Sequence, residues 1–177
     1  MTARPMLLLL TVALVPAVLA AEPDAGTHRG PAISTTLKDR QGRTVGTLAL
    51  ADTPHGLLVR GTLDGVPPGP HALHFHEVGK CEPPFASAGG HFNPEHKSHG
   101  MLSPGGPHAG DLPNLVVPAS GKLDFELFVP GLTLSSGPSA VLDADGSAIV
   151  IHAKADDHQS QPAGDSGDRI ACAVVAR

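Results

Sequence analysis

Histidines are concentrated in one part of this 177-residue chain, and their spacing favours metal binding. His74 and His76 stand two residues apart in a segment expected to be a strand, so both imidazoles lie on one face and can chelate one ion. His71 shares the other face with Leu73 and Phe75, and we expect it to make internal hydrogen bonds. A lone pair of strand histidines is often merely solvated, so the metal prediction depends on further ligands.

Further candidate ligands follow this strand. Three imidazoles and one carboxylate form a closed tetrahedral set of the type that zinc prefers, while imidazole pairs without thiolates suit copper as well as zinc. His152 can complete the site of His74 and His76, and Asp156 can accept ring N–H bonds behind the ligands. The spacing of all these residues together disfavours the alternative, a run of surface histidines on a flexible loop. The set of four comprises His91, His99, His108 and Asp111.

Short strands must position these residues. Alternating or β-branched segments separated by turns predict an antiparallel, all-β sandwich or flattened barrel of about eight strands without a convincing helix. Two long polar loops, residues 79–114 and 153–168, interrupt the strands. An irregular stretch as long as the first loop needs stabilising links to the rest of the domain, and here we expect these to be bound metal and a disulfide. The expected strands span residues 32–37, 44–50, 57–63, 71–77, 122–129, 147–152 and 170–175.

Composition limits the class of protein. The length fits one domain, and a hydrophobic content of 41% is enough for a packed core. The 21 Gly and 18 Pro favour many turns over long helices. A formal charge of −5 and the absence of Trp and Tyr argue against a nucleic-acid partner, which usually meets a basic patch.

Residues 1–21 have the pattern of a secretory signal peptide, which leaves residues 22–177 as the mature domain. Arg4 precedes a short apolar run, and small residues around Ala20 suit cleavage. The alternative is an uncleaved anchor, but the apolar stretch that begins at Met6 is shorter than the roughly 20 residues that a spanning helix needs. We therefore expect an exported protein, periplasmic or secreted, with no membrane contact after processing.

Two cysteines, Cys81 and Cys172, belong to the mature domain. An even number of cysteines in an oxidising compartment favours one disulfide, which would close a loop of about 90 residues. Two separate buried thiols remain the alternative, because the sequence does not show whether the two Cα atoms approach each other.

Several of these segments, taken in order, resemble copper/zinc superoxide dismutase, and most closely its exported bacterial branch. The resemblance extends from about residue 32 to residue 175. One departure is Ala173, where the family usually has glycine after the second cysteine. The segments that carry the resemblance are HALHFHE (71–77), SAGGHFNP (87–94), HG (99–100), HAGDLPN (108–114) and GDRIAC (167–172).

The resemblance implies an eight-stranded antiparallel Greek-key barrel, flattened into a sandwich, that holds copper and zinc. His91 would bridge the two metals, and Asp156 would link their surroundings by hydrogen bonds. Arg169 would face the copper and bind anions, and Cys81 and Cys172 would form the family disulfide. The implied copper ligands are His74, His76, His91 and His152, and the implied zinc ligands are His91, His99, His108 and Asp111.

The activity that the resemblance implies is dismutation of superoxide to oxygen and hydrogen peroxide, which would protect the cell envelope from oxidative damage. Copper would carry the electron, zinc would hold His91 in place, and His91 would supply a proton. Arg169 would attract the superoxide anion locally, because the chain as a whole is negative. Two alternatives stay open, a non-catalytic copper or zinc carrier of the same fold and a structural β-domain with zinc alone. A homodimer also stays open.

Overall fold

The computed structural model describes residues 32–177, so the predicted leader, residues 1–21, and residues 22–31 lie outside the described residues. The regular secondary structure of this part of the chain consists of strands, as predicted, apart from a short 3₁₀ turn at Ala86–Ala88. None of its helices is long and apolar enough to cross a membrane. Its nine strands are β1 (Ala32–Asp39), β2 (Thr44–Thr53), β3 (Gly56–Asp64), β4 (Gly69–His71), β5 (Leu73–His76), β6 (Leu115–Val117), β7 (Lys122–Pro130), β8 (Ser147–His152) and β9 (Arg169–Val175).

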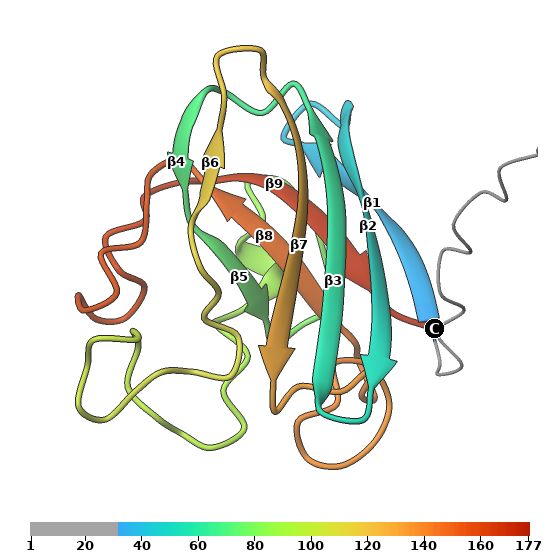
Figure 1. Ribbon diagram of the computed structural model, residues 1–177, viewed down its shortest axis with the longest axis vertical. Coiled ribbons are helices and arrows are strands. Elements are labelled where there is room, and N and C mark those ends of the chain that lie inside the picture. The colour runs from blue at the N-terminus through green and yellow to red at the C-terminus, as the bar shows by residue number, and fades with distance from the viewer. Residues whose placement is uncertain (1–31) are drawn as a thin grey trace, which may run out of the picture.

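Seven strands form one curled antiparallel sheet in the order β5-β8-β9-β1-β2-β3-β7, and β4 pairs with β6 in a small second sheet. Figure 1 shows β2, β3 and β7 in front of β5, β8 and β9, so the sheet folds over into two layers. The layers join where β1 meets β9, at Lys38 opposite Cys172 and Asp39 opposite Ala171. The chain leaves the front layer after β3 and returns to pair β7 with β3, which is a Greek-key connection.

The core lies between the two layers and is formed mainly by every second residue along each strand, which faces inward. In β8, however, every residue is buried. Ile149 and Ile151 belong to the main core, while Ala148 and Val150 pack on the opposite side against Phe85. The segment around Phe85 therefore covers the outer face of β8.

A disulfide holds this covering segment in place. Cys81 is bonded to Cys172 of β9, with the two Cα atoms 5.7 Å apart and a sequence separation of 91 residues. This confirms the predicted pairing and excludes two separate thiols. Since Cys172 packs in the same cluster as Phe85, the beginning of the first long loop is fixed to the back layer.

The strand predicted over residues 71–77 is divided into β4 and β5 at Ala72. Ala72 donates its N–H to Lys154 O (2.8 Å) and accepts the N–H of His152 at its carbonyl (2.9 Å). Its backbone thus bonds to the chain that leaves β8, which prevents one continuous strand. This division and the additional strand β6, which has only three residues, account for the difference between the seven strand ranges expected from the sequence and the nine observed.

Candidate metal centre

The free edge of β5 receives the first long loop. Phe75 donates its N–H to Gly110 O (2.9 Å) and accepts the N–H of Phe92 at its carbonyl (2.8 Å). Gly110 donates in turn to Phe92 O (2.9 Å), and a Cβ at Gly110 would collide with the Phe75 carbonyl. Glycine at this position lets the loop lie flat on β5. His74 and His76, predicted to share one face of a strand, are therefore fully buried beneath the loop.

The first group of candidate ligands consists of four imidazoles from β5, β8 and this loop. All four are buried, and one ligand atom from each lies within 4.8 Å of those of the others. Each ring has one buried nitrogen without a hydrogen-bond partner, an arrangement that is unfavourable unless a cation occupies the space between them. Imidazole nitrogen is a ligand that copper accepts readily, so the group fits a copper ion. The unpartnered atoms are His74 Nδ1, His76 Nε2, His91 Nε2 and His152 Nε2.

The second ring nitrogen of His76 and of His152 is hydrogen-bonded to a backbone carbonyl, which fixes the orientation of each ring. His76 Nδ1 donates to Gly89 O (3.0 Å), and His152 Nδ1 donates to Gly167 O (3.2 Å). A carbonyl only accepts, so the ring proton stays at Nδ1 and the lone pair at Nε2 points into the group. The rings are therefore held ready for a metal by contacts outside the ligand set.

The second group surrounds Asp111. Its Oδ1 lies 2.8 Å from His91 Nδ1 and 3.1 Å from His99 Nδ1. The same oxygen lies 3.3 Å from His108 Nδ1. Asp111 Oδ2 accepts the backbone N–H of Gly100 (2.9 Å), which fixes the carboxylate. Three imidazoles and one carboxylate in a buried cluster fit a tetrahedral zinc ion.

His91 belongs to both groups. Its Nδ1 faces Asp111, and its Nε2 is one of the unpartnered atoms of the first group. The ring centroid of His91 lies 4.0 Å from that of His74 in the first group and 5.1 Å from that of His99 in the second. A single imidazole thus separates the two groups, as a bridging ligand would.

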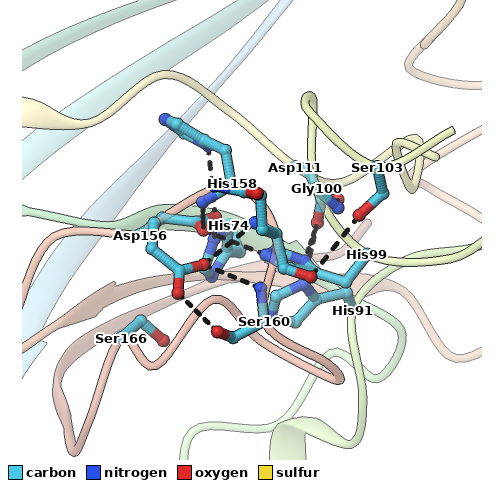
Figure 2. Close-up of polar contacts among 12 residues, drawn as sticks. His74, His91, His99, Gly100, Ser103, Asp111, Asp156, His158, Ser160 and Ser166 are labelled. Atoms are coloured by element: carbon cyan, nitrogen blue, oxygen red, sulfur yellow. Dashed lines mark hydrogen bonds and ion pairs between the residues drawn. The ribbon is translucent and has the colours of Figure 1, made fainter.

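Asp156 connects the two groups through hydrogen bonds to His74 and His99, all three of which are labelled in Figure 2. Its Oδ2 accepts the Nε2–H of His74 (2.8 Å), and its Oδ1 accepts the Nε2–H of His99 (3.0 Å). Asn114 fixes the backbone of Asp156 by donating to its carbonyl (2.8 Å) and accepting its N–H (2.8 Å). One buried carboxylate therefore contacts and orients one ring of each group.

Burial sets the protonation states of these residues. It lowers the pKa of His74 to about 4, that of His76 to about 2 and that of His152 to about 3. Burial alone would raise the pKa values of Asp111 and Asp156, but hydrogen bonds from their imidazole and backbone partners outweigh it and lower them. At neutral pH the three imidazoles are neutral and both carboxylates are ionised, as metal binding requires.

Arg169 opens β9 beside the first group. Its Nη1 donates to Phe85 O (2.6 Å), and its Nη2 donates to Gly89 O (2.7 Å). Gly89 O also accepts the Nδ1–H of His76 (3.0 Å), so the guanidinium lies beside this ring of the first group. Burial lowers the pKa of Arg169 itself, yet a guanidinium stays charged at neutral pH.

Some residues that support the site were not predicted as such. His158 is half-buried and donates its backbone N–H to Asp156 Oδ1 (2.6 Å). Gly164 has φ +65°, and a Cβ there would collide with Asp156 Oδ1 and His99 Nε2. Asn114 lies in a motif that the sequence does reveal, but no local pattern shows that it meets a residue 42 positions away. His71 makes internal hydrogen bonds, as expected, with ring nitrogens 2.7 and 2.8 Å from two backbone carbonyls.

Comparisons with known proteins agree with this geometry. The family model for copper/zinc superoxide dismutase (SODC) matches residues 44–175. The copper/zinc superoxide dismutase 2 of Aquifex aeolicus is 43% identical over 142 residues, which cover 78% of this chain and 83% of that protein. The copper/zinc superoxide dismutase of Caulobacter vibrioides is 42% identical over 146 residues, covering 80% and 84% of the two chains.

Solved structures show the same relationship. The crystal structure of a superoxide dismutase-like protein from Bacillus subtilis aligns with a TM-score of 0.77 at 40% identity, covering 80% of this chain and 97% of that one. The copper/zinc superoxide dismutase of Brucella abortus aligns with a TM-score of 0.66 at 26% identity, covering 82% and 99%. The chain therefore belongs to the copper/zinc superoxide dismutase family, whose enzymes use copper and zinc.

Proposed function

We propose that the protein converts superoxide to oxygen and hydrogen peroxide, with copper in the first group and zinc in the second. The observation that carries this proposal is the position of His91, whose two ring nitrogens face the two groups. Membership of the family supports the activity. Copper would be held by His74, His76, His91 and His152, and zinc by His91, His99, His108 and Asp111.

The reaction consumes two superoxide anions and two protons and releases one oxygen and one hydrogen peroxide. Copper, when bound, supplies the one-electron chemistry, since zinc does not change its oxidation state. His91 would hold one of the protons at Nε2 when this nitrogen is not bound to copper, because the atom is buried and has no hydrogen-bond partner among the described residues. Its Nδ1 meanwhile stays on the side of Asp111 (2.8 Å), which keeps the ring in position.

Arg169 supplies the positive charge that attracts the substrate. Superoxide is an anion and the chain carries a formal charge of −5, so the attraction must be local. Bonds to Phe85 O and Gly89 O engage one N–H on each terminal nitrogen of the guanidinium. The remaining N–H groups are free to donate to an anion, because a guanidinium has five such donors.

Replacement of Arg169 tests this role. Arg169→Ala is expected to slow turnover about tenfold and to weaken its dependence on ionic strength, because local steering is lost. Copper and zinc contents should stay unchanged, since Arg169 is outside both ligand groups. Turnover is measured by pulse radiolysis over a range of salt concentrations. An unchanged rate and salt profile would reject the role.

We also propose that the chain is exported and protects the cell envelope. The disulfide between Cys81 and Cys172 supports export, because disulfides persist in oxidising compartments. Mass spectrometry of the protein from a fractionated cell tests this directly. We expect a chain cut after Ala20 or Ala21 in the envelope or medium, and full-length protein in the cytoplasm would contradict it.

The decisive experiment combines metal analysis with superoxide turnover on the exported protein. We expect one copper and one zinc per chain, a copper resonance in the electron paramagnetic spectrum, and rapid consumption of superoxide. Bound copper without turnover would favour a non-catalytic copper carrier of the same fold. Zinc alone, with no copper resonance after copper titration, would favour a structural domain.

A further inference from the structure

Arg40 lies directly after β1 and contacts the residue that opens β9. Its Nε donates to the backbone carbonyl of Arg169 (2.7 Å), and its Nη2 lies 3.2 Å from Asp168 Oδ2. β1 and β9 pair over two residue pairs that end at Asp39 opposite Ala171. The Arg40 side chain therefore adds a contact between the two strands beyond the last backbone pair.

The turn that carries Arg40 is itself fixed. Asp39 Oδ1 accepts the backbone N–H groups of Gln41 and Arg43, both at 2.9 Å. Asp39 Oδ2 accepts the Nε–H of Arg43 (2.6 Å), and the N–H of Gly42 closes the turn on the Asp39 carbonyl (3.0 Å). Arg40 thus extends from a defined position and not from a free loop.

Arg169 is consequently held at two points. Its guanidinium is bonded to Phe85 and Gly89, which belong to the loop fixed by the disulfide. Its backbone is bonded to Arg40, at the point where the second long loop ends and β9 begins. Loss of the Arg40 contact would free the backbone end and let the guanidinium move away from the copper group.

We infer that Arg40 is a positioning residue for Arg169, keeping its guanidinium directed at the site where the substrate anion binds. This inference rests on the anion-binding role proposed above for Arg169. The carbonyl bond is the contact that matters, since the ion pair joins side chains that are 34% and 75% exposed, and exposed ion pairs contribute little. A hydrogen bond from a charged donor is stronger than one from a neutral donor.

Three variants separate the two contacts of Arg40. Arg40→Ala removes both contacts. Arg40→Lys keeps the positive charge but loses the Nε–H and the forked geometry that serves two acceptors at once. Asp168→Asn is the matched control, because it abolishes the ion pair and leaves the bond to the Arg169 carbonyl intact.

The experiment titrates azide, a small monovalent anion, into the copper- and zinc-loaded enzyme and follows the copper absorption. In parallel, hydrogen exchange of the Arg169 Nη–H groups, which donate to Phe85 O and Gly89 O, is measured by NMR on metal-free protein. Arg40→Ala and Arg40→Lys should raise the azide dissociation constant about 3- to 10-fold, the scale of one partly exposed hydrogen bond, and should speed the exchange. Asp168→Asn should change the dissociation constant by less than about twofold.

Other results would overturn the inference. Azide binding in Arg40→Lys that equals wild type, with weakened binding in Arg40→Ala, would show that Arg40 acts by charge alone. A lower melting temperature in both variants, with unchanged azide binding and exchange, would show a purely structural role. Arg169→Ala is measured alongside: if it does not weaken azide binding, the proposed role of Arg169 fails as well. If it does and the Arg40 variants do not, only the role of Arg40 is rejected.

Discussion

Replacement of Asp156 by Asn should weaken metal binding at both groups, and zinc more than copper. The side chain of Asp156 is fully buried, and its two oxygens accept one ring N–H from each group. An amide has one oxygen and no charge, so it cannot orient both rings. Loss of a supporting carboxylate typically lowers metal affinity about 10- to 100-fold, or about 1.4 to 2.8 kcal/mol.

The two groups should differ because their rings are supported differently. His74 lies in β5, where the strand limits its orientation, and we expect about a tenfold loss of copper affinity. His99 lies in the first long loop and depends more on Asp156, so zinc affinity should fall about 100-fold.

The assay is competition for each metal against a chelator of known affinity, with metal content measured after equilibrium. Asp157→Asn is the matched control, because Asp157 is exposed and its carboxylate bonds only to Gln159 and Ser160. Circular dichroism checks that both variants are folded. Zinc affinity within twofold of wild type in a folded Asp156→Asn variant would refute the role of Asp156 as the support of both groups.

Three further predictions concern the same site. Gly164→Ala should lose zinc as Asp156→Asn does, because the new Cβ would displace the Asp156 carboxylate. Gly167→Ala is the control: Gly167 has a similar φ of +73°, but only a lysine side chain lies nearby, so metal analysis should find its zinc retained. Reduction of the disulfide should lower the free energy of unfolding by about 4–5 kcal/mol in the chain-entropy model, and a urea midpoint equal to that of the oxidised protein would contradict this. The free energy of unfolding of the metal-free protein should fall as pH drops below about 6.5. Burial lowers the pKa of three imidazoles of the first group in the folded protein, so the unfolded chain binds protons at a higher pH than the folded chain and is favoured by acid. Urea titrations at pH 5 and 7.5 measure this, and equal midpoints would show that these imidazoles titrate as they do in the unfolded chain.

Much of the architecture follows from local sequence patterns. Alternation of apolar and polar residues places most strands within one to three residues of their observed ends, because the alternating directions of successive side chains are a property of the strand itself. The division at Ala72 could not be predicted, since it depends on hydrogen bonds to His152 and Lys154, about 80 residues away. The same is true of β6, which is too short for a periodic pattern.

The candidate ligands were recognisable from the sequence because metal binding restricts the residue types and their spacing. The sequence alone also predicted the disulfide and an inward-facing His71. Tertiary structure decided which nitrogen of each ring faces which group, since that depends on acceptors such as Gly89 and Asp156 brought in from elsewhere. It also buried His74 and His76 beneath a loop and joined Arg40 to Arg169 across 129 residues. Such contacts arise from strand order and packing, which no local pattern of side chains encodes.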